Sequence, residues 1–357
     1  MEILSRLPIK TLFDCRRVCK TWRNLLSDPH FAELHVARSP ISLLLKTFHM
    51  RPESRMLHLF DLQGANTGHL DDRLKLKAEV NIPNFRFALL NSCNGLLCLC
   101  EPDYSDNPIC VCNPILGEYI TLPKVKVGMR CCGAGFGFSH ETNQYKVIRV
   151  LARMDAASDN KDYEAEIYTL GGGAWRSIGN ALFSMWCRSS FNTLVNGALH
   201  WLYGGCDNPD NIDYIPSFHF GSEEFGAIPA PAEKLMGYLH LGVLGGCLSI
   251  CDGTNSDHID IWIMKNYGVK ESWSKDFVID NLIFERHNLD FYEPIMILNS
   301  GEILILFNHD AVVLYSHETK GFDYLDIFGV KSMFEAIAHI PSFVSLRDVA
   351  KGENLKV

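Results

Sequence analysis

A glycine cluster and four closely spaced cysteines are the parts of the sequence whose residue types could do chemistry. The glycine cluster, GAGFGF at residues 133–138, would bind phosphate if it led into a helix whose N–H groups faced the anion. It leads instead into a strand-like run and lacks the spacing of a dinucleotide-binding fingerprint. We expect these glycines to lie at the edge of a strand.

The cysteines form two C-x-C pairs, Cys98/Cys100 and Cys110/Cys112, and four thiolates could in principle hold zinc. Closed zinc sites favour a wider spacing within each pair. Both pairs fall in apolar runs, where cysteine behaves as a small hydrophobic residue. We predict no metal and no cofactor, with zinc as the alternative. The histidines complete no ligand set at His200 or His258, and the former is expected to be a core residue.

Three catalytic signatures are missing from the sequence: the G-x-S-x-G elbow, the Walker loop and H-E-x-x-H. The sequence therefore contains none of these motifs for nucleophilic, phosphoryl-transfer or zinc-protease chemistry, and we predict no catalytic residue. A triad assembled from distant parts of the chain is not tested by a motif search.

The composition indicates a soluble protein with a large core. The chain of 357 residues is 47% hydrophobic, enough for one large β domain with a small appendage. Its net charge of −9 argues against nucleic-acid binding, which requires clustered positive charge. Neither a secretory signal nor a membrane-spanning apolar run is found. We expect a cytoplasmic or nuclear protein that binds no membrane and whose 13 cysteines stay reduced.

Residues 1–35 differ from the rest of the chain. They hold six basic and four acidic side chains, which leaves 27 basic and 38 acidic ones for the remainder. Pro8 marks a helix start, and Asp28-Pro29 marks a stop or a kink. After residue 40, short runs of β-branched and aromatic residues alternate with turn residues, as in strands. Helical three- and four-residue steps separate most of the apolar residues Ile9, Leu12, Phe13, Val18, Trp22, Leu25 and Leu26.

A repeat of about fifty residues organises the rest of the chain. In four units a turn glycine precedes an apolar strand, at Gly95, Gly197, Gly246 and Gly301. In five units an aromatic residue opens a strand directly after a turn, at intervals of 56, 50, 48 and 49 residues: Tyr119, Trp175, Phe225, Trp273 and Phe322.

A strand-only repeat of this length is typical of a kelch-like β-propeller, in which four-stranded blades stack into a ring because none can bury both faces alone. Residues 41–45 and 56–62, closed by strands from residues 341–346, supply a sixth unit, so we predict about six blades. We expect the repeated aromatic side chains to fill the wedges between blades. A β-sandwich is the alternative architecture.

The helical start resembles the F-box of plant F-box proteins in its ILSRLPIK, RRVCKTWRNL and SDPHFAELH stretches. The remainder resembles the F-box-associated domain of the same family through LLNSCNGLLCL, GFGFSHETNQYKVIRV, VNGALHWL, and LGVLGGCLSICD followed by IWIMKNYGVKESW. These motifs keep the family's order along nearly the whole chain. The resemblance implies an F-box in residues 1–39 and a propeller domain in residues 40–357.

The resemblance also implies the substrate-recognition subunit of an SCF-type ubiquitin ligase. The F-box would dock onto a Skp-family adaptor, and through it a cullin scaffold, while the propeller binds an unknown protein substrate. Such a subunit is not an enzyme; it raises the effective concentration of substrate lysines near the loaded enzyme. By the same resemblance, the adaptor-facing or helix-packing surface would be formed by Leu7, Pro8, Leu12, Val18, Cys19 and Trp22.

One departure from the family lies at the start of the sequence. Typical members carry further residues before EILSRLP, which form the early part of the first F-box helix, whereas this sequence opens at Met1. We therefore expect an N-terminally incomplete F-box with weaker adaptor binding. A propeller interaction module that has lost ligase docking is the second hypothesis, and a propeller enzyme is the third.

Substrate contacts are expected from loops at one end of the ring, because loops vary while strands keep the shape. The candidate loops are residues 101–108, 153–162, 185–189, 206–214 and 284–292, and which of them share a face is left open. The acidic propeller favours a neutral or basic target surface. Aromatic and arginine side chains dominate binding hot spots, so we predict contacts from Tyr104, Arg153, Trp186, Arg188, Tyr214, Arg286 and Tyr292.

Overall fold

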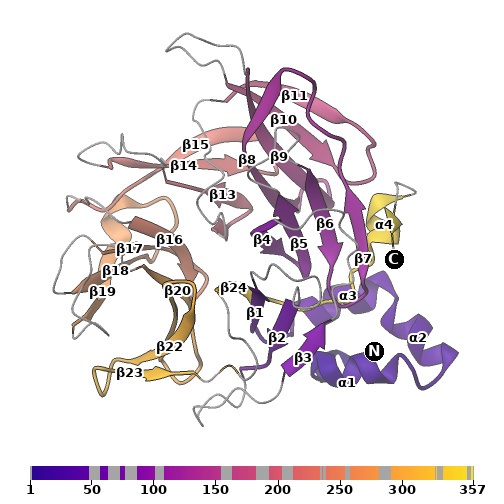
Figure 1. Ribbon diagram of the computed structural model, residues 1–357, viewed down its shortest axis with the longest axis horizontal. Helices are drawn as coiled ribbons and strands as arrows, with labels where there is room; N and C mark the ends of the chain where they lie inside the picture. Colours follow the sequence, from indigo (N-terminus) through magenta and orange to yellow (C-terminus); the bar gives the residue numbers. More distant parts are fainter. Residues whose placement is uncertain are drawn as a thin grey trace.

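The computed structural model describes residues 2–47, 57–62, 73–76, 87–100, 108–153, 163–181, 193–202, 212–233, 235, 239–253, 258–280, 291–325, 327, 333–351 and 355–356. None of the helices in these ranges is long and apolar enough to cross a membrane. The strands form six sheets, and Figure 1 shows them arranged as blades around a common axis. The predicted β-propeller is confirmed.

Blades 3 to 6 each consist of four consecutive strands. Blade 3 holds β8 (Met129–Ser139), β9 (Gln144–Arg153), β10 (Tyr163–Thr169) and β11 (Trp175–Asn180). Blade 4 holds β12 (Leu194–Val195), β13 (Ala198–His200), β14 (Tyr214–His219) and β15 (Glu224–Pro229). Blade 5 holds β16 (Leu239–Leu244), β17 (Cys247–Asp252), β18 (Ile259–Met264) and, after the short helix η4 (Lys270–Ser272), β19 (Trp273–Ile279). Blade 6 holds β20 (Tyr292–Ile297), β21 (Ile303–Phe307), β22 (Ala311–Ser316) and β23 (Gly321–Tyr324).

Blades 1 and 2 use both ends of the chain. Blade 1 joins β24 (Phe334–His339) to β1 (Ser42–Thr47), β2 (Leu57–Phe60) and β3 (Arg73–Leu76), which closes the ring. Blade 2 holds β4 (Ala88–Cys93), β5 (Leu96–Cys100), β6 (Ile109–Asn113) and β7 (Glu118–Thr121), with β25 (Leu355–Lys356) added beside β7.

The closing strand differs from the prediction. We expected residues 341–346 to close the ring, but β24 ends at His339, and the chain then leaves the sheet and leads into the helix α4 (Leu346–Ala350). Pro341 has no N–H to donate to a strand ladder, so the ladder stops before it.

The repeated residues occupy equivalent positions in the blades. The four turn glycines all connect the first strand of a blade to the second, with φ of 83° at Gly95 and 72° at Gly197, a region that favours glycine. The five repeated aromatic residues all lie at the first or second position of the fourth strand of a blade: Tyr119 in β7, Trp175 in β11, Phe225 in β15, Trp273 in β19 and Phe322 in β23.

Two of these aromatic residues tie neighbouring blades together. The indole N–H of Trp175 donates to the carbonyl of Pro123 over 2.8 Å, on the chain leaving blade 2. The indole N–H of Trp273 donates over 2.8 Å to the carbonyl of Pro229, at the end of blade 4. The predicted wedge role is confirmed for both residues.

Polar side chains also join blades through backbone groups. The amide of Asn91 in β4 pairs with Phe136 in β8, donating to its carbonyl over 2.5 Å and accepting from its N–H over 3.1 Å. The buried Lys146 of blade 3 donates over 2.8 Å to the carboxylate of Glu223 in blade 4 and over 3.1 Å to the carbonyl of Phe220. These bonds fix the relative position of adjacent blades.

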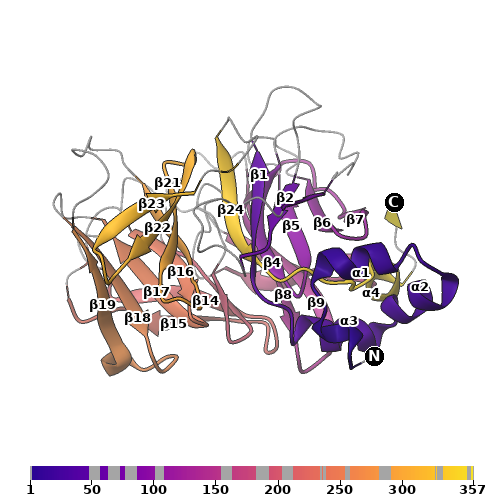
Figure 2. The same cartoon turned by 90° about the horizontal axis from the view of Figure 1, so that it is seen from below.

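The helical segment comprises η1 (Leu4–Arg6), α1 (Ile9–Cys15), α2 (Lys20–Leu26) and α3 (Pro29–Val36). Cys19 caps α2 by accepting from the N–H of Trp22, and Asp28 caps α3 by accepting from the N–H of His30 over 2.9 Å. Helices of seven or eight residues are too short to be stable alone in water. They lie against blades 1 and 2, as Figure 2 shows.

Three buried histidines should make stability depend on pH. Burial lowers the pKa of His35, of His200 to about 4 and of His339 to about 3, so each is uncharged in the fold at neutral pH. The unfolded chain binds their protons near the usual pKa of about 6.5. Stability is therefore complete above that pH and falls below it, by up to about 1.4 kcal/mol per pH unit for each histidine.

Urea unfolding midpoints measured at about pH 7.5 and about pH 5 test this expectation, since mainly histidines change charge in that interval. We expect a clearly lower midpoint at the acidic pH. Equal midpoints would contradict the burial of neutral histidines.

Candidate functional site

The helical segment and the propeller share one hydrophobic core. Leu12, Leu26 and Phe31, one from each α-helix of the segment, are fully buried. They belong to the same cluster as β1, β2, β5 and β6, through residues such as Leu44 and Leu97. Because the segment has few other residues to bury, it depends on this contact for its fold.

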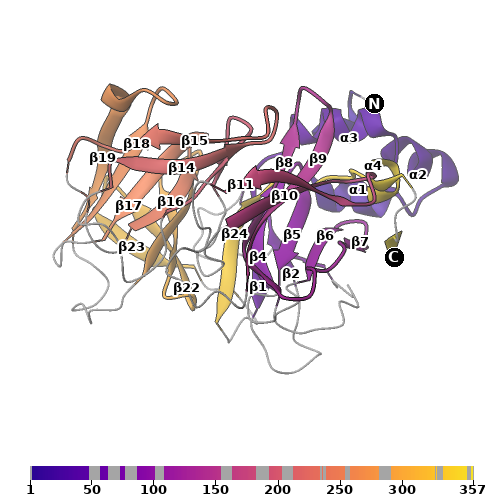
Figure 3. The same cartoon turned by 90° about the horizontal axis from the view of Figure 1, so that it is seen from above.

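The chain that follows β24 also packs against the helical segment, through Phe343. The buried ring of Phe343 lies 6.5 Å from that of Phe31 and 5.9 Å from that of His35, and the guanidinium of Arg16 lies 5.5 Å from it. Figure 3 shows α4 beside the helical segment at the same edge of the ring.

Blade 2 holds this C-terminal segment through its turns. The side-chain amide of Asn113 donates to the carbonyls of Ser342 over 3.0 Å and Val344 over 2.7 Å. The carboxylate of Glu118 accepts from the N–H of Leu346 over 2.7 Å. A Cβ on Gly95 would lie 2.0 Å from Oγ of Ser342, so only glycine permits this approach. Residues 342–346 thus lie between the ring and the helical segment.

Of the six residues predicted to form the adaptor-facing or helix-packing surface, some pack inside the helical segment and others are exposed to solvent. Leu12 is fully buried and packs internally, so it cannot contact a partner in this conformation, and Leu7 is half-buried against the same cluster. Pro8 and Cys19 are exposed, as are Val18 (70%) and Trp22 (37%). Ile3, which is 80% exposed, is an apolar residue of the helical segment that the resemblance did not point to.

The described strand ends that flank the five predicted loops lie on one face of the ring. The loops themselves fall almost entirely outside the described residues. Successive strands of a blade are antiparallel, so the connection from second to third strand and the connection to the next blade start from the same face. Three of the loops are of the first kind, at residues 101–108, 153–162 and 206–214, and two are of the second, at residues 185–189 and 284–292. We call this side the loop face and the side with the glycine turns the turn face. The helical segment joins β1 on the turn face, at Ser42.

The predicted substrate contacts differ in their exposure to solvent. Arg153 and Tyr214 are exposed at strand ends on the loop face, Tyr214 by 62%. Tyr292 is buried, and the prediction that it is exposed is wrong: its ring packs 4.9 Å from that of Phe307 inside blade 6. The other four predicted contacts, Tyr104, Trp186, Arg188 and Arg286, lie outside the described residues.

Several exposed apolar residues of the loop face were not predicted. Val127 is fully exposed, Tyr324 is 51% exposed, Met333 55% and Phe291 36%. Tyr324 and Met333 escaped notice because they lie next to regular strands, where an apolar residue is expected to be buried. Phe291 lies within the predicted loop 284–292 but was not named as a contact. With Tyr214, these residues form a group of exposed apolar side chains on the loop face, whereas Val269 is exposed by 45% on the turn face.

The glycine cluster has a packing role. It lies within β8, where a Cβ on Gly135 would meet Leu199 at 2.1 Å and a Cβ on Gly137 would meet the ring of Phe220 at 2.2 Å. Both contacts are with blade 4. The glycines therefore permit close approach of two blades, as their placement in a strand suggested.

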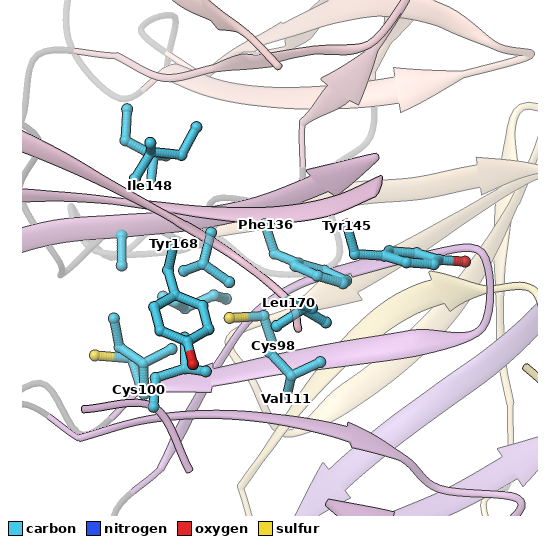
Figure 4. Packing of buried hydrophobic residues seen from close by; sticks show 14 of the residues in the cluster. Cys98, Cys100, Val111, Phe136, Tyr145, Ile148, Tyr168 and Leu170 are labelled. Atoms are coloured by element: carbon cyan, nitrogen blue, oxygen red, sulfur yellow. The ribbon is translucent and has the colours of Figure 1, made fainter. Parts of the chain in front are cut away.

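The two cysteine pairs face opposite sides of blade 2. Alternation along β5 and β6 puts Cys98 and Cys100 in the core shared with blade 3, shown in Figure 4, and Cys110 and Cys112 in the core shared with the helical segment. Burial raises the pKa of the Cys112 thiol to about 12. The four sulfurs cannot converge on one ion, and the described residues contain no group of His, Cys, Asp or Glu suited to a metal.

The remaining candidates for chemistry have structural roles as well. His200 is buried as predicted, and its Nε2 lies 2.8 Å from the hydroxyl of Tyr267. A cavity of about 60 Å³ lies between the inner strands of the blades, lined by Ser92, Glu293 and other residues of β16, β20 and β24. It has room for only a few water molecules.

Comparisons with known proteins agree with this division of the chain. Residues 1–34 match the model of the F-box domain, and residues 46–345 match that of the F-box associated beta propeller domain. The chain is 30% identical to the F-box protein At3g07870 of Arabidopsis thaliana, over 95% of this chain and 88% of that protein. It is 26% identical to the F-box/kelch-repeat protein At3g23880 of Arabidopsis thaliana, over 98% and 94%.

Solved structures are more distant. A chain of a nidogen/laminin complex is 12% identical, with a TM-score of 0.49 over 84% of this chain and 98% of that one. TolB from Acinetobacter baumannii is 9% identical, with a TM-score of 0.43 over 88% and 72%.

Substituting Gly137 by alanine should destabilise the ring, because the added methyl overlaps the Phe220 ring. We expect a loss of about 1–3 kcal/mol in the free energy of unfolding, measured with urea. The matched control is Gly321→Ala, whose Cβ would lie 3.5 Å from Oγ1 of Thr319, an ordinary van der Waals distance. Equal losses in the two variants would contradict the close approach of blades 3 and 4.

Removing the Phe343 ring should loosen the helical segment. A buried phenylalanine truncated to alanine costs about 3–5 kcal/mol, and here much of that loss falls on the contact with Phe31. We expect trypsin to cleave Phe343→Ala within residues 10–38 much faster than the wild type, while the ring resists. Val18→Ala, at an exposed site, is the control. Unchanged cleavage of the Phe343 variant would contradict the shared core.

Proposed function

The chain belongs to the plant F-box proteins with an associated β-propeller domain, and we propose that it is the substrate-recognition subunit of an SCF-type ubiquitin ligase. On this proposal the helical segment docks onto a Skp-family adaptor, and through it a cullin scaffold. The loop face binds the protein to be ubiquitinated, in the cytosol or the nucleus.

The observation that carries the proposal is the location of exposed apolar side chains. Within the described residues, Val18 and Trp22 expose apolar surface on the helical segment, and Tyr214, Tyr324 and Met333 do so on the loop face. Exposed apolar patches on a soluble protein are characteristic of interaction sites. Two such patches, separated by the ring, suit a protein that connects two partners.

The contribution of this chain on this proposal is geometric. The shared core around Leu12, Leu26 and Phe31 holds the adaptor-binding surface at a set position relative to the loop face. A substrate bound to the loops would then be kept at a high effective concentration near the conjugating enzyme. No bond is made or broken by the chain itself.

Binding of a purified Skp-family adaptor tests the proposal directly. Trp22→Ala and Val18→Glu remove or charge the exposed apolar surface of the helical segment without touching its core. We expect each to weaken adaptor binding by about tenfold or more, because aromatic residues at interface centres dominate affinity. Calorimetry or surface plasmon resonance measures the change.

Val269→Ala is the matched control, since Val269 is 45% exposed on the propeller, away from the helical segment. It should bind the adaptor as the wild type does. A wild-type chain that does not bind the adaptor at all would favour the interaction module without ligase docking. If the wild type binds the adaptor and every variant binds it with the same affinity, the adaptor uses another surface of the chain.

A further inference from the structure

The loop face carries an aromatic and acidic patch that extends across blade 6, from the mouth of the central channel to the outermost strand. We define this channel-mouth patch by Phe291, Tyr324 and Met333, which are exposed, with Asp310 and Glu293 beside them. Phe291 and Glu293 belong to the inner edge of blade 6, and Tyr324 ends its outermost strand. Met333 directly precedes β24 of blade 1.

Hydrogen bonds through the β21–β22 turn connect Phe291 of blade 6 with the residue that follows Met333 in blade 1. The N–H of Phe291 donates over 2.8 Å to the side chain of Asn308, whose own N–H donates over 3.0 Å to the Phe291 carbonyl. The N–H of Phe334, next to Met333, donates over 2.7 Å to the carbonyl of His309. Asp310 follows in the same turn. The turn thus joins blade 6 to blade 1 at the channel mouth.

The turn has two unusual features. Asn308 and His309 are consecutive non-glycine residues with φ of 49° and 57°, a conformation that costs energy and persists where the surroundings require it. Nδ1 of His309 is buried and has no hydrogen-bond partner within the described part of the chain.

The charge of the patch is negative. Asp310 is exposed, and Glu293 lines the cavity between the inner strands of the blades. His240, whose ring lies 5.9 Å from that of Phe291, adds no positive charge at neutral pH, because burial lowers its pKa. The described members of the patch include no lysine or arginine.

We propose that the channel-mouth patch binds a segment of the protein substrate in which a lysine or arginine side chain lies next to apolar residues. The inference rests on the proposed substrate-recognition function and specifies its ligand. A cation is attracted both by the carboxylates and by the faces of Phe291 and Tyr324. Apolar neighbours of that cation cover Met333. An acidic or phosphorylated segment would be repelled by Asp310 and Glu293.

Two synthetic fluorescent peptides serve as probes. One repeats lysine and leucine separated by serine, and the other has glutamate in place of every lysine. Fluorescence anisotropy with the full chain, without adaptor, should show that the lysine peptide binds about tenfold or more tightly than the glutamate peptide.

A pair of charge-matched double variants localises the binding. Tyr324→Ser with Asp310→Asn removes one exposed ring and one carboxylate from the patch. Val269→Ser with Glu271→Gln makes the same change in charge on the turn face and removes an exposed apolar side chain that has no ring. We expect the first variant to weaken binding of the lysine peptide by about tenfold and the second to leave it unchanged.

Two results would overturn the proposal. Equal or tighter binding of the glutamate peptide would contradict the sign of the charge. Equal weakening in both variants would indicate general attraction to an acidic protein. Neither result bears on the ligase proposal, because the patch variant should bind the adaptor normally and Trp22→Ala should bind the lysine peptide normally.

Discussion

The contact between Phe31 and Phe343 is the interaction on which the arrangement of this protein depends. It joins the third helix of the N-terminal segment to the chain that follows the last blade strand, and both rings are buried in one cluster with blades 1 and 2. The short helices lack a core of their own, so the propeller supplies it. Sequence positions more than three hundred residues apart thereby form one unit.

This shared core gives the molecule two separate surfaces with a set geometry. The helical segment is attached on the turn face, and the candidate substrate loops all start from the loop face. A flexible linker between the two parts would let a bound substrate sample many positions. Direct packing limits those positions, which matters for a subunit whose proposed contribution is to hold a substrate near an enzyme.

Much of the fold followed from local patterns. The turn glycine recurs in four blades, and a turn-following aromatic residue such as Trp175 recurs in five. They recur because each four-stranded blade packs against its neighbours in the same way. The closing strand did not follow, because β24 pairs with β1 across the whole chain and no local signal encodes that partner. Among the predicted site residues, burial decided the outcome: Leu12 and Tyr292 face cores formed by distant segments, whereas Val18 and Tyr214 face solvent. Helical or strand periodicity alone does not distinguish these cases.

Amide hydrogen exchange of the full chain tests the shared core most directly. If the helical segment folds only as part of the propeller, the amides of α2 and α3 near Leu26 and Phe31 should be protected to a degree comparable with the strands of blade 2, since they open only when the common cluster opens. Exchange of these helical amides within seconds, while the strands stay protected, would contradict the account, because it would show a helical segment that is attached to the ring without sharing its core.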